Sequence, residues 1–206
     1  MCQNRRMCDK KRRIRRMVRN DAWCWNKELP HKTCQKLIKL GEEKWEQAKT
    51  FALAKGKISD DIRKSDVVWI RDQWVYDLIW PWMVTANEEA GWKYDIIAAA
   101  DCQLTRYTKD GFYIWHKDGM GSHYEVHDEP DNKFLHGNVR KLSMSIILND
   151  EYEGGDFEII GLKEPLPRLE KGTIIVFPSF IEHRVIPVTK GTRYSLVAWF
   201  VGRPFV

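Results

Sequence analysis

Residues 172–200 read GTIIVFPSFIEHRVIPVTKGTRYSLVAWF. In this stretch, short runs rich in β-branched and aromatic residues alternate with turns that contain polar residues, glycine or proline, which is the pattern of successive β-strands. Similar runs begin near residue 95, namely DIIAAADCQLTRYT, FYIWHKD, KLSMSIILND and GDFEII. So many short strands in succession predict an antiparallel barrel or a double-sheet jelly roll.

The sequence before residue 95 has a different periodicity. Apolar residues recur at helical spacing across HKTCQKLIKLGEEKWEQAKT, residues 31–50, although Gly41 interrupts them. They recur again in QWVYDLIWPWMVTANEEAG, residues 73–91, with Pro81 as a kink and a glycine as the stop signal. We therefore expect helices packed on one side of the strands.

These patterns define the expected organisation of the chain. Residues 21–94 are predicted to form a helical layer that supports a β core of residues 95–206, so that residues 21–206 make one structural domain of ordinary size. The predicted fold class is α+β or mainly β. Residues 1–20 are expected to form a separate, flexible tail.

Positive charge is concentrated in that tail. Nine Lys or Arg against one acid give residues 1–20 a charge of +8, so the rest of the chain carries −3 of the total of +5. Such a run is typical of a solvated tail. If the protein contacts nucleic acid, we expect the tail to make that contact and salt to weaken it.

Cysteine usage and hydropathy bear on location. The five cysteines include no CxxC pair, which disfavours a disulfide framework or a structural zinc site and favours a reducing compartment. No apolar stretch approaches 18 residues, and no apolar segment follows the basic start. We therefore expect a cytoplasmic protein without membrane contact. The oligomeric state does not follow from the sequence.

A metal site is predicted by FYIWHKD. On a strand, His116 and Asp118 share a face, and a third donor from a later strand would complete the facial triad of non-haem Fe(II) oxygenases. His183, at the start of HRVIPV, is the candidate for that donor. An isolated HxD is more often a hydrogen-bonded pair on a surface strand, so the argument depends on all three residues together.

A second cluster of possible ligands lies in HYEVHDEPD. It consists of His123, Glu125, His127 and Asp128. The spacing is not HExxH, and the surrounding glycines and proline argue against a helix that could present both histidines. We expect a solvated polar loop here, with a mobile lid over the substrate as the functional alternative.

Arg193 is the candidate anchor for a carboxylate. Strand alternation places Arg193, Ser195, Val197 and Trp199 on one face of TRYSLVAWF, and both faces are largely apolar. A buried guanidinium needs a negative partner, and a bidentate carboxylate suits it best. That partner is either an internal Asp or Glu or a dicarboxylic co-substrate, with the Ser195 hydroxyl as an additional donor.

As a set, these motifs resemble the Fe(II)/2-oxoglutarate dioxygenase superfamily, and in particular its prolyl 4-hydroxylase-like branch. The matching pieces, in order, are RYTKDGFYIWHKD, EGGDF, KGTIIVFPS, the His of PSFIEHRV and the RYS that follows it by ten residues. The resemblance covers about residues 100–206 and extends more weakly to RKSDVVWI and the Trp-rich segment after it.

The resemblance implies a double-stranded β-helix with Fe(II) bound by His116, Asp118 and His183. It implies that Arg193, assisted by Ser195 and Tyr107, holds 2-oxoglutarate as co-substrate. Turnover would consume molecular oxygen and produce succinate and carbon dioxide, with ascorbate as a candidate reductant. Less directly, the resemblance assigns the substrate pocket to three further residues, which are Tyr113, Arg140 and Trp199. Their alternatives are barrel packing for the two aromatic residues and a surface strand-edge charge for Arg140.

The resemblance also implies the substrate class, a peptidyl proline in a protein or peptide. An arginine anchor is similar to bacterial and phage-like members, and the loop at residues 119–139 looks long, so the exact substrate stays open. A nucleic-acid oxygenase is the alternative suggested by the basic tail, although Trp199 stands where DNA-repair members carry a second arginine. A non-catalytic cupin-like module is the other alternative.

Overall fold

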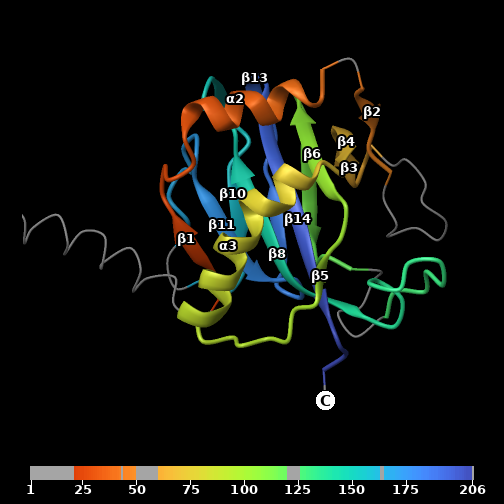
Figure 1. The fold of residues 1–206 in the computed structure, drawn as a ribbon. Helices are drawn as coiled ribbons and strands as arrows, with labels where there is room; N and C mark the ends of the chain where they lie inside the picture. Colours follow the sequence, from red (N-terminus) through yellow and green to blue (C-terminus); the bar gives the residue numbers. More distant parts are fainter. Residues whose placement is uncertain (1–20, 43, 50–59, 120–125, 163–164, 206) are drawn as a thin grey trace, which may run out of the picture.

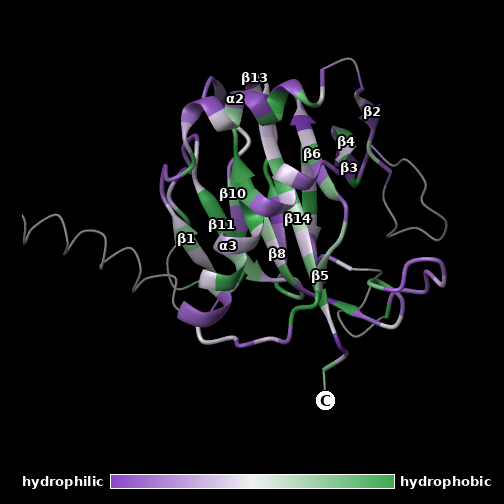
Figure 2. Ribbon diagram, viewed as in Figure 1, coloured by the Kyte–Doolittle hydropathy of each residue, from purple (hydrophilic) through white to green (hydrophobic). Residues whose placement is uncertain are grey.

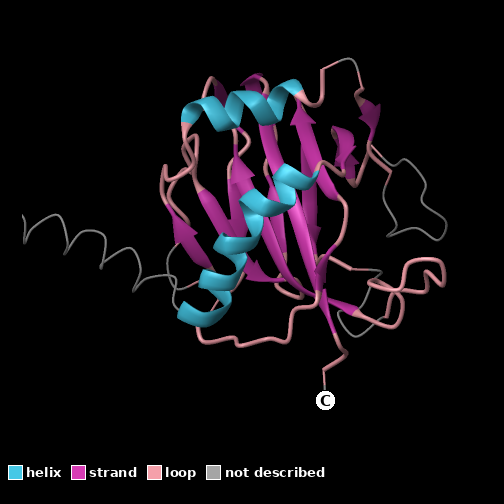
Figure 3. Cartoon of the chain, in the orientation of Figure 1, coloured by secondary structure: helices cyan, strands magenta, loops and turns pink. Residues whose placement is uncertain are grey.

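The computed structural model describes residues 21–42, 44–49, 60–119, 126–162 and 165–205. Antiparallel strands dominate this part of the chain, and two helices lie in front of the strands in Figures 1 and 3. The predicted fold class is thereby confirmed. Neither described helix is both long and apolar enough to cross a lipid bilayer.

A large sheet carries most of the strands. Its order is β1 (Trp23–Trp25), β11 (Ile174–Pro178), β8 (Val139–Ile147), β14 (Arg193–Gly202), β6 (Cys102–Tyr107), β4 (Asp66–Ile70) and β2 (Glu46–Gln47), with β5 (Ala98–Ala99) pairing with the far end of β14.

A smaller sheet faces it. Its order is β10 (Phe157–Ile159), β12 (His183–Val185), β7 (Phe112–His116) and β3 (Arg63–Lys64). A separate pair consists of β9 (Tyr152–Gly154) and β13 (Val188–Gly191).

The helices cover one face of the large sheet. α2 (His31–Lys39) and α3 (Gln73–Glu89) pack on it through a core that includes Leu37, Ile79, Leu104 and Phe200, none more than 1% exposed. Figure 2 shows hydrophobic residues on the central strands and hydrophilic residues on the outer sides of the helices. This is the one-sided helical layer that the sequence predicts.

The first helix is shorter than its apolar spacing suggests. α2 gives way to a turn at Leu40, and the chain then enters β2. At Gly41 a Cβ atom would lie 2.6 Å from side-chain atoms of both Trp45 and Leu104. Glycine is needed there because the chain turns back closely over its own core. The helix expected across residues 31–50 was therefore wrong beyond residue 40.

The segment before residue 95 is also more than a helical layer. β1 pairs with β11, β4 with β6 and β3 with β7, so this segment extends both sheets. Local periodicity could not show this, because strand pairing joins residues that are distant in sequence. The tail expected at residues 1–20 lies outside the described residues.

A second core fills the space between the two sheets. Ile147, Ile175 and Phe177 of the large sheet belong to the same buried cluster as Phe157 and Val185 of the small one. Two facing antiparallel sheets with a shared apolar interior are the arrangement of a jelly roll. Polar and charged residues of both sheets also line a pocket between them, and the candidate site lies there.

Candidate functional site

A pocket of about 440 Å³ opens between the two sheets. β14 supplies one wall through Arg193, Ser195, Val197 and Trp199, while the intervening Tyr194, Leu196, Ala198 and Phe200 belong to the helix-side core. The predicted alternation of this strand is confirmed. The opposite wall carries the residues of the predicted metal site.

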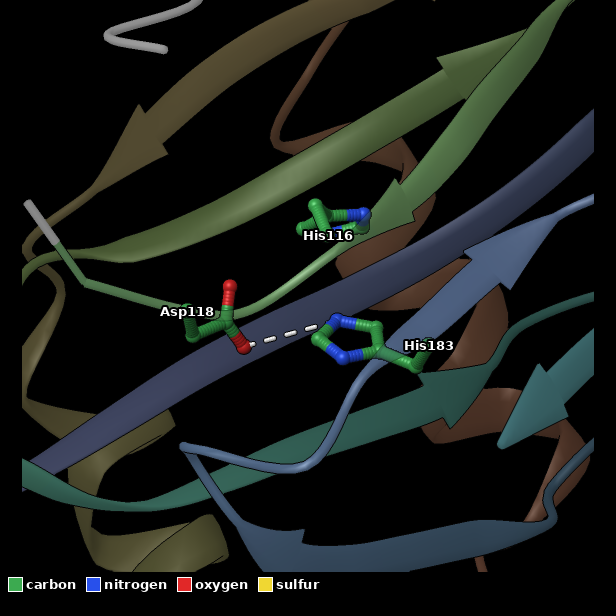
Figure 4. A group of neighbouring side chains, drawn as sticks. All are labelled: His116, Asp118 and His183. Carbon is green, nitrogen blue, oxygen red and sulfur yellow. Dashed lines mark ion pairs between the residues drawn. The ribbon is translucent and has the colours of Figure 1, made fainter. Parts of the chain in front are cut away.

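His116, Asp118 and His183 are brought together in this pocket. One candidate ligand atom from each lies within 4.8 Å of the others. His116 and His183 are direct partners across β7 and β12, with ring centroids 4.2 Å apart. Figure 4 shows the Asp118 carboxylate facing the His183 ring, with Oδ2 3.6 Å from Nε2 and the His116 ring beside them.

Asp118 lies just beyond the strand rather than on it. β7 ends at His116, and the backbone N–H of Asp118 donates to the Ser179 carbonyl at 3.0 Å. The shared strand face expected for the HxD pair is therefore replaced by a bend that follows the strand. The Ser143 hydroxyl donates to Asp118 Oδ2 at 2.6 Å and lies 2.9 Å from the Ser179 hydroxyl, so a hydrogen-bonded pair of serines holds this carboxylate.

Both imidazoles have the tautomer that a metal requires. Nδ1 of His116 lies 2.8 Å from the Ile114 carbonyl, and Nδ1 of His183 lies 3.0 Å from the Ile181 carbonyl. Because a carbonyl only accepts, each Nδ1 must carry the proton, which leaves both Nε2 atoms free to bind.

The protonation states suit metal binding as well. Burial, together with the neighbouring His183, lowers the pKa of His116 to about 3, so this imidazole is neutral near pH 7. Burial by itself would raise the pKa of Asp118, but His183 and the other neighbours of the carboxyl, which include Arg140 and the Ser143 hydroxyl, together outweigh burial and lower the value. A neutral His116 imidazole and an ionised Asp118 carboxylate are the forms that ligate Fe(II).

Arg193 is only 1% exposed, and the described residues supply no acidic partner for it. Its Nη1 donates to the Ser195 hydroxyl at 3.0 Å, while its buried Nε has no hydrogen-bond partner in the described part of the chain. Its guanidinium carbon lies 5.5 Å from the ring centre of Tyr107, its direct partner across β6 and β14. No described acidic residue therefore forms the internal ion pair with Arg193 that was considered from the sequence. A bound carboxylate fits this cation.

The three expected substrate residues also line the pocket. Tyr113 stacks on His116 with ring centroids 3.4 Å apart, and Arg140 lies over Trp199 with 4.4 Å from its guanidinium carbon to the ring centre. Arg140 is not the exposed strand-edge charge considered from the sequence. Burial lowers the pKa of its guanidinium, although Asp118 opposes that effect.

Two residues of the site were missed. Ser143 holds Asp118, and Arg63, 7% exposed, lies over the Tyr113 ring. The serines at alternate positions of the apolar run KLSMSII were a signal, because they mark a polar strand face. Nothing in the sequence near Arg63 distinguishes it from the other cations.

The loop after Asp118 is not wholly solvated. His127 is 6% exposed, forms a bridge with His136 and lies 3.4 Å from Glu129. It is absent from the group that could hold a metal. His123 and Glu125 lie outside the described residues, so the lid expected for this loop stays a prediction.

Comparison with known proteins finds a matching family model. Residues 102–201 match the model of the 2OG-Fe(II) oxygenase superfamily. A PKHD-type hydroxylase of Synechococcus sp. (strain CC9311) is 39% identical over 79 residues, which are 37% of this chain and 35% of that protein. One of Picosynechococcus sp. is 40% identical over 84 residues, 39% of this chain and 37% of that protein. The chain thus matches little more than a third of the length of these curated relatives.

Solved structures share the fold. The viral collagen prolyl hydroxylase of Paramecium Bursaria Chlorella virus-1, solved with 2OG, aligns with a TM-score of 0.64 at 19% identity, covering 88% of this chain and 96% of that one. A prolyl hydroxylase of Trichoplax adhaerens, solved with a hypoxia-inducible-factor peptide fragment, aligns with a TM-score of 0.67 at 18% identity. The alignment covers 94% of this chain and 91% of that one.

Proposed function

We propose, from the premise that residues 102–201 form a domain of the 2OG-Fe(II) oxygenase superfamily, that the protein hydroxylates a C–H bond with Fe(II) and 2-oxoglutarate. His116, Asp118 and His183 would bind Fe(II), and Arg193 with Ser195 would bind the distal carboxylate of 2-oxoglutarate. The observation that carries the proposal is the buried Arg193, which has no acidic partner in the described residues and lines the same pocket as the triad.

The bound metal and co-substrate would supply oxidative decarboxylation with molecular oxygen, giving succinate, carbon dioxide and an oxidant for the substrate. The chain's own residues would bind and orient the metal and the co-substrate. Ser143 fixes the Asp118 carboxylate, the two backbone carbonyls fix the imidazole tautomers, and Arg193 sets the direction in which a dicarboxylate enters. The apolar walls around His183, among them Phe157 and Phe177, limit access of water.

The proposed substrate is a peptidyl proline. The relatives named as PKHD-type hydroxylases and the fold shared with prolyl hydroxylases support this class. The stacked Tyr113 and the Arg140–Trp199 pair offer an aromatic surface next to the triad, and a pyrrolidine ring would pack well against it. The nucleic-acid alternative is not favoured, since the similar curated proteins are named as PKHD-type hydroxylases and Trp199 stands where DNA-repair members carry a second arginine. The cytoplasmic location and a role for ascorbate stay predictions.

Anaerobic reconstitution tests the cofactor assignment. Fe(II) and 2-oxoglutarate added together should give a metal-to-ligand charge-transfer band, and admission of oxygen with a proline peptide should give succinate and a hydroxylated peptide by mass spectrometry. Asp118→Ala should lose both signals. Succinate formation coupled to peptide hydroxylation in that variant would refute the metal site, and absence of the band in the intact protein would refute the cofactor assignment.

A further inference from the structure

Three arginines of the described chain line the pocket, namely Arg63, Arg140 and Arg193. None forms an ion pair with a described acidic residue. Among the described residues that line the pocket, the acids are Asp118 and Glu182. Since Asp118 belongs to the metal triad, the pocket holds more buried positive charge than its own carboxylates balance.

The co-substrate would supply a carboxylate partner for Arg193, but it supplies none for the other two arginines. Arg63 is 7% exposed, and its neutral partners are the Ser65 hydroxyl at 2.7 Å and the side-chain amide oxygen Oε1 of Gln103 at 2.8 Å. These groups orient the guanidinium without neutralising it. Its carbon lies 4.8 Å from the centre of the Tyr113 ring, which itself stacks on His116.

Arg140 is the less satisfied of the two. Its guanidinium carbon lies 4.4 Å from the ring centre of Trp199, and its buried Nε has no hydrogen-bond partner among the described residues. The indole N–H of Trp199 is likewise buried without a partner there. Two donors without acceptors therefore lie side by side on the wall of the pocket. Leaving a buried cation and a buried donor unpaired is costly, which points to an acceptor that arrives with the substrate.

The charge balance decides what kind of acceptor this is. The charge of Fe(II) and the charge of the 2-oxoglutarate dianion cancel. The three positive charges of the guanidinium groups then exceed the single negative charge of Asp118 by two. At the rim, the exposed Lys49 and Lys117 outnumber Glu182. A peptide carbonyl would satisfy the hydrogen bonds but would leave this charge uncompensated. A carboxylate would satisfy both and match the guanidinium fork.

We propose that the substrate is an acidic polypeptide segment, with an Asp or Glu next to the residue that is hydroxylated, and that its carboxylate pairs with Arg140. This inference rests on the proposed function. Arg63, beside Tyr113, adds to the positive potential, but its guanidinium already donates to Ser65 and Gln103. The selectivity is therefore assigned chiefly to Arg140.

Matched peptides test the assignment on the full chain loaded with Fe(II) and 2-oxoglutarate. Proline peptides with Asp on either side of the proline are compared with the same peptides carrying Asn. We expect kcat/KM at least tenfold higher for an Asp peptide, with a preference that falls as salt is raised. Direct peptide affinity, measured anaerobically so that no turnover occurs, should show the same order.

Variants test whether Arg140 causes the preference for Asp peptides over Asn peptides. Arg140→Gln should reduce the Asp-over-Asn ratio to less than twofold, whereas Arg140→Lys should keep part of it. Arg184→Gln removes a positive charge that does not line the pocket and that pairs with Glu158, and it serves as the control, with less than a twofold change in the ratio. The charge-transfer band shows whether each variant still loads Fe(II) and 2-oxoglutarate.

Several outcomes would overturn the inference. Equal kcat/KM for Asp and Asn peptides in the intact protein would do so, as would a full preference in Arg140→Gln, or turnover of an oligonucleotide in place of every peptide. In each case an intact charge-transfer band would leave the cofactor assignment standing. Absence of the band would refute the proposed function itself.

Discussion

The hydroxyl of Ser143 donates a 2.6 Å hydrogen bond to Oδ2 of Asp118, a residue 25 positions earlier in the chain. Both side chains are buried, and Ser179 closes the network with a 2.9 Å contact to the same hydroxyl. A carboxylate held in this way does not have to be ordered when a metal binds. Ser143 is therefore a positioning residue for the proposed Fe(II) site.

Ser143→Ala should weaken metal binding while the protein stays folded. Loss of an outer hydrogen bond to a ligand typically costs about 10- to 100-fold in metal affinity. A Co(II) or Fe(II) titration without 2-oxoglutarate measures this directly. Ser145→Ala is the matched control, since Ser145 lies on the same strand face without a bond to Asp118. Equal affinities in the two variants would remove the positioning role from Ser143.

Arg193→Met should separate function from stability. The described chain offers no acid to Arg193, so replacing this 1% exposed side chain by an apolar one of similar length should leave the free energy of unfolding of the apoprotein unchanged or raise it. The variant should lose the stabilisation by 2-oxoglutarate, which reaches about 2.7 kcal/mol at a hundredfold excess over Kd. Chemical denaturation with and without 2-oxoglutarate measures both quantities.

Arg184→Met is the control for that experiment, because Arg184 pairs with Glu158 and does not line the pocket. It should keep the full response to 2-oxoglutarate. A large loss of apoprotein stability in Arg193→Met would show that the arginine has an internal partner after all.

Gly155→Ala should raise the concentration of 2-oxoglutarate required for turnover. At Gly155, φ is +64° and a Cβ would lie 2.8 Å from Val188 Cγ2 and 3.1 Å from Arg193 Cδ, so the substitution presses on the proposed anchor. Gly137→Ala is the matched control, since φ at Gly137 is +73° and a Cβ added there would have no atom within 4 Å.

Both alanine variants carry the strain of a positive φ, about 1 kcal/mol. Only Gly155→Ala should change the KM for 2-oxoglutarate. The measurement is initial rate against co-substrate concentration, and a similar KM in the two variants would contradict the prediction.

Ile79→Ala should destabilise the fold without changing the site. Ile79 is fully buried between α3 and the large sheet, on the face away from the pocket, and truncation of such a side chain costs about 2–5 kcal/mol. Val84→Ala, on the same helix but 44% exposed, should cost less than about 0.5 kcal/mol. Urea denaturation measures both. The KM for 2-oxoglutarate of the folded Ile79→Ala protein should equal that of the parent.

Much of the candidate site could be predicted because its parts are locally encoded. The alternation of TRYSLVAWF placed Arg193 and Ser195 on the pocket face, and the motif order brought out His116, Asp118 and His183. Their roles as ligands and anchor remain proposals. The bend at Asp118 is a local feature too, but the alternating strand pattern of FYIWHKD did not reveal it.

Other features could not be predicted because the pairing partners are distant in sequence. The chain between His183 and Arg193 contains β13, which pairs with β9, and these two residues lie on different sheets. Arg63 carries no local signal at all, because its place over Tyr113 results from the pairing of β3 with β7.

The sequence by itself determined the succession of strands, the apolar and polar faces of each and the identity of the metal-binding and carboxylate-binding candidates. These properties follow from side-chain chemistry and a two-residue period, both of which are local. The tertiary structure alone decided that Ser143 reaches Asp118 and that three arginines share one pocket with few acids. Those relationships depend on which strands pair and how the two sheets close on each other, and contacts between segments distant in sequence set that arrangement.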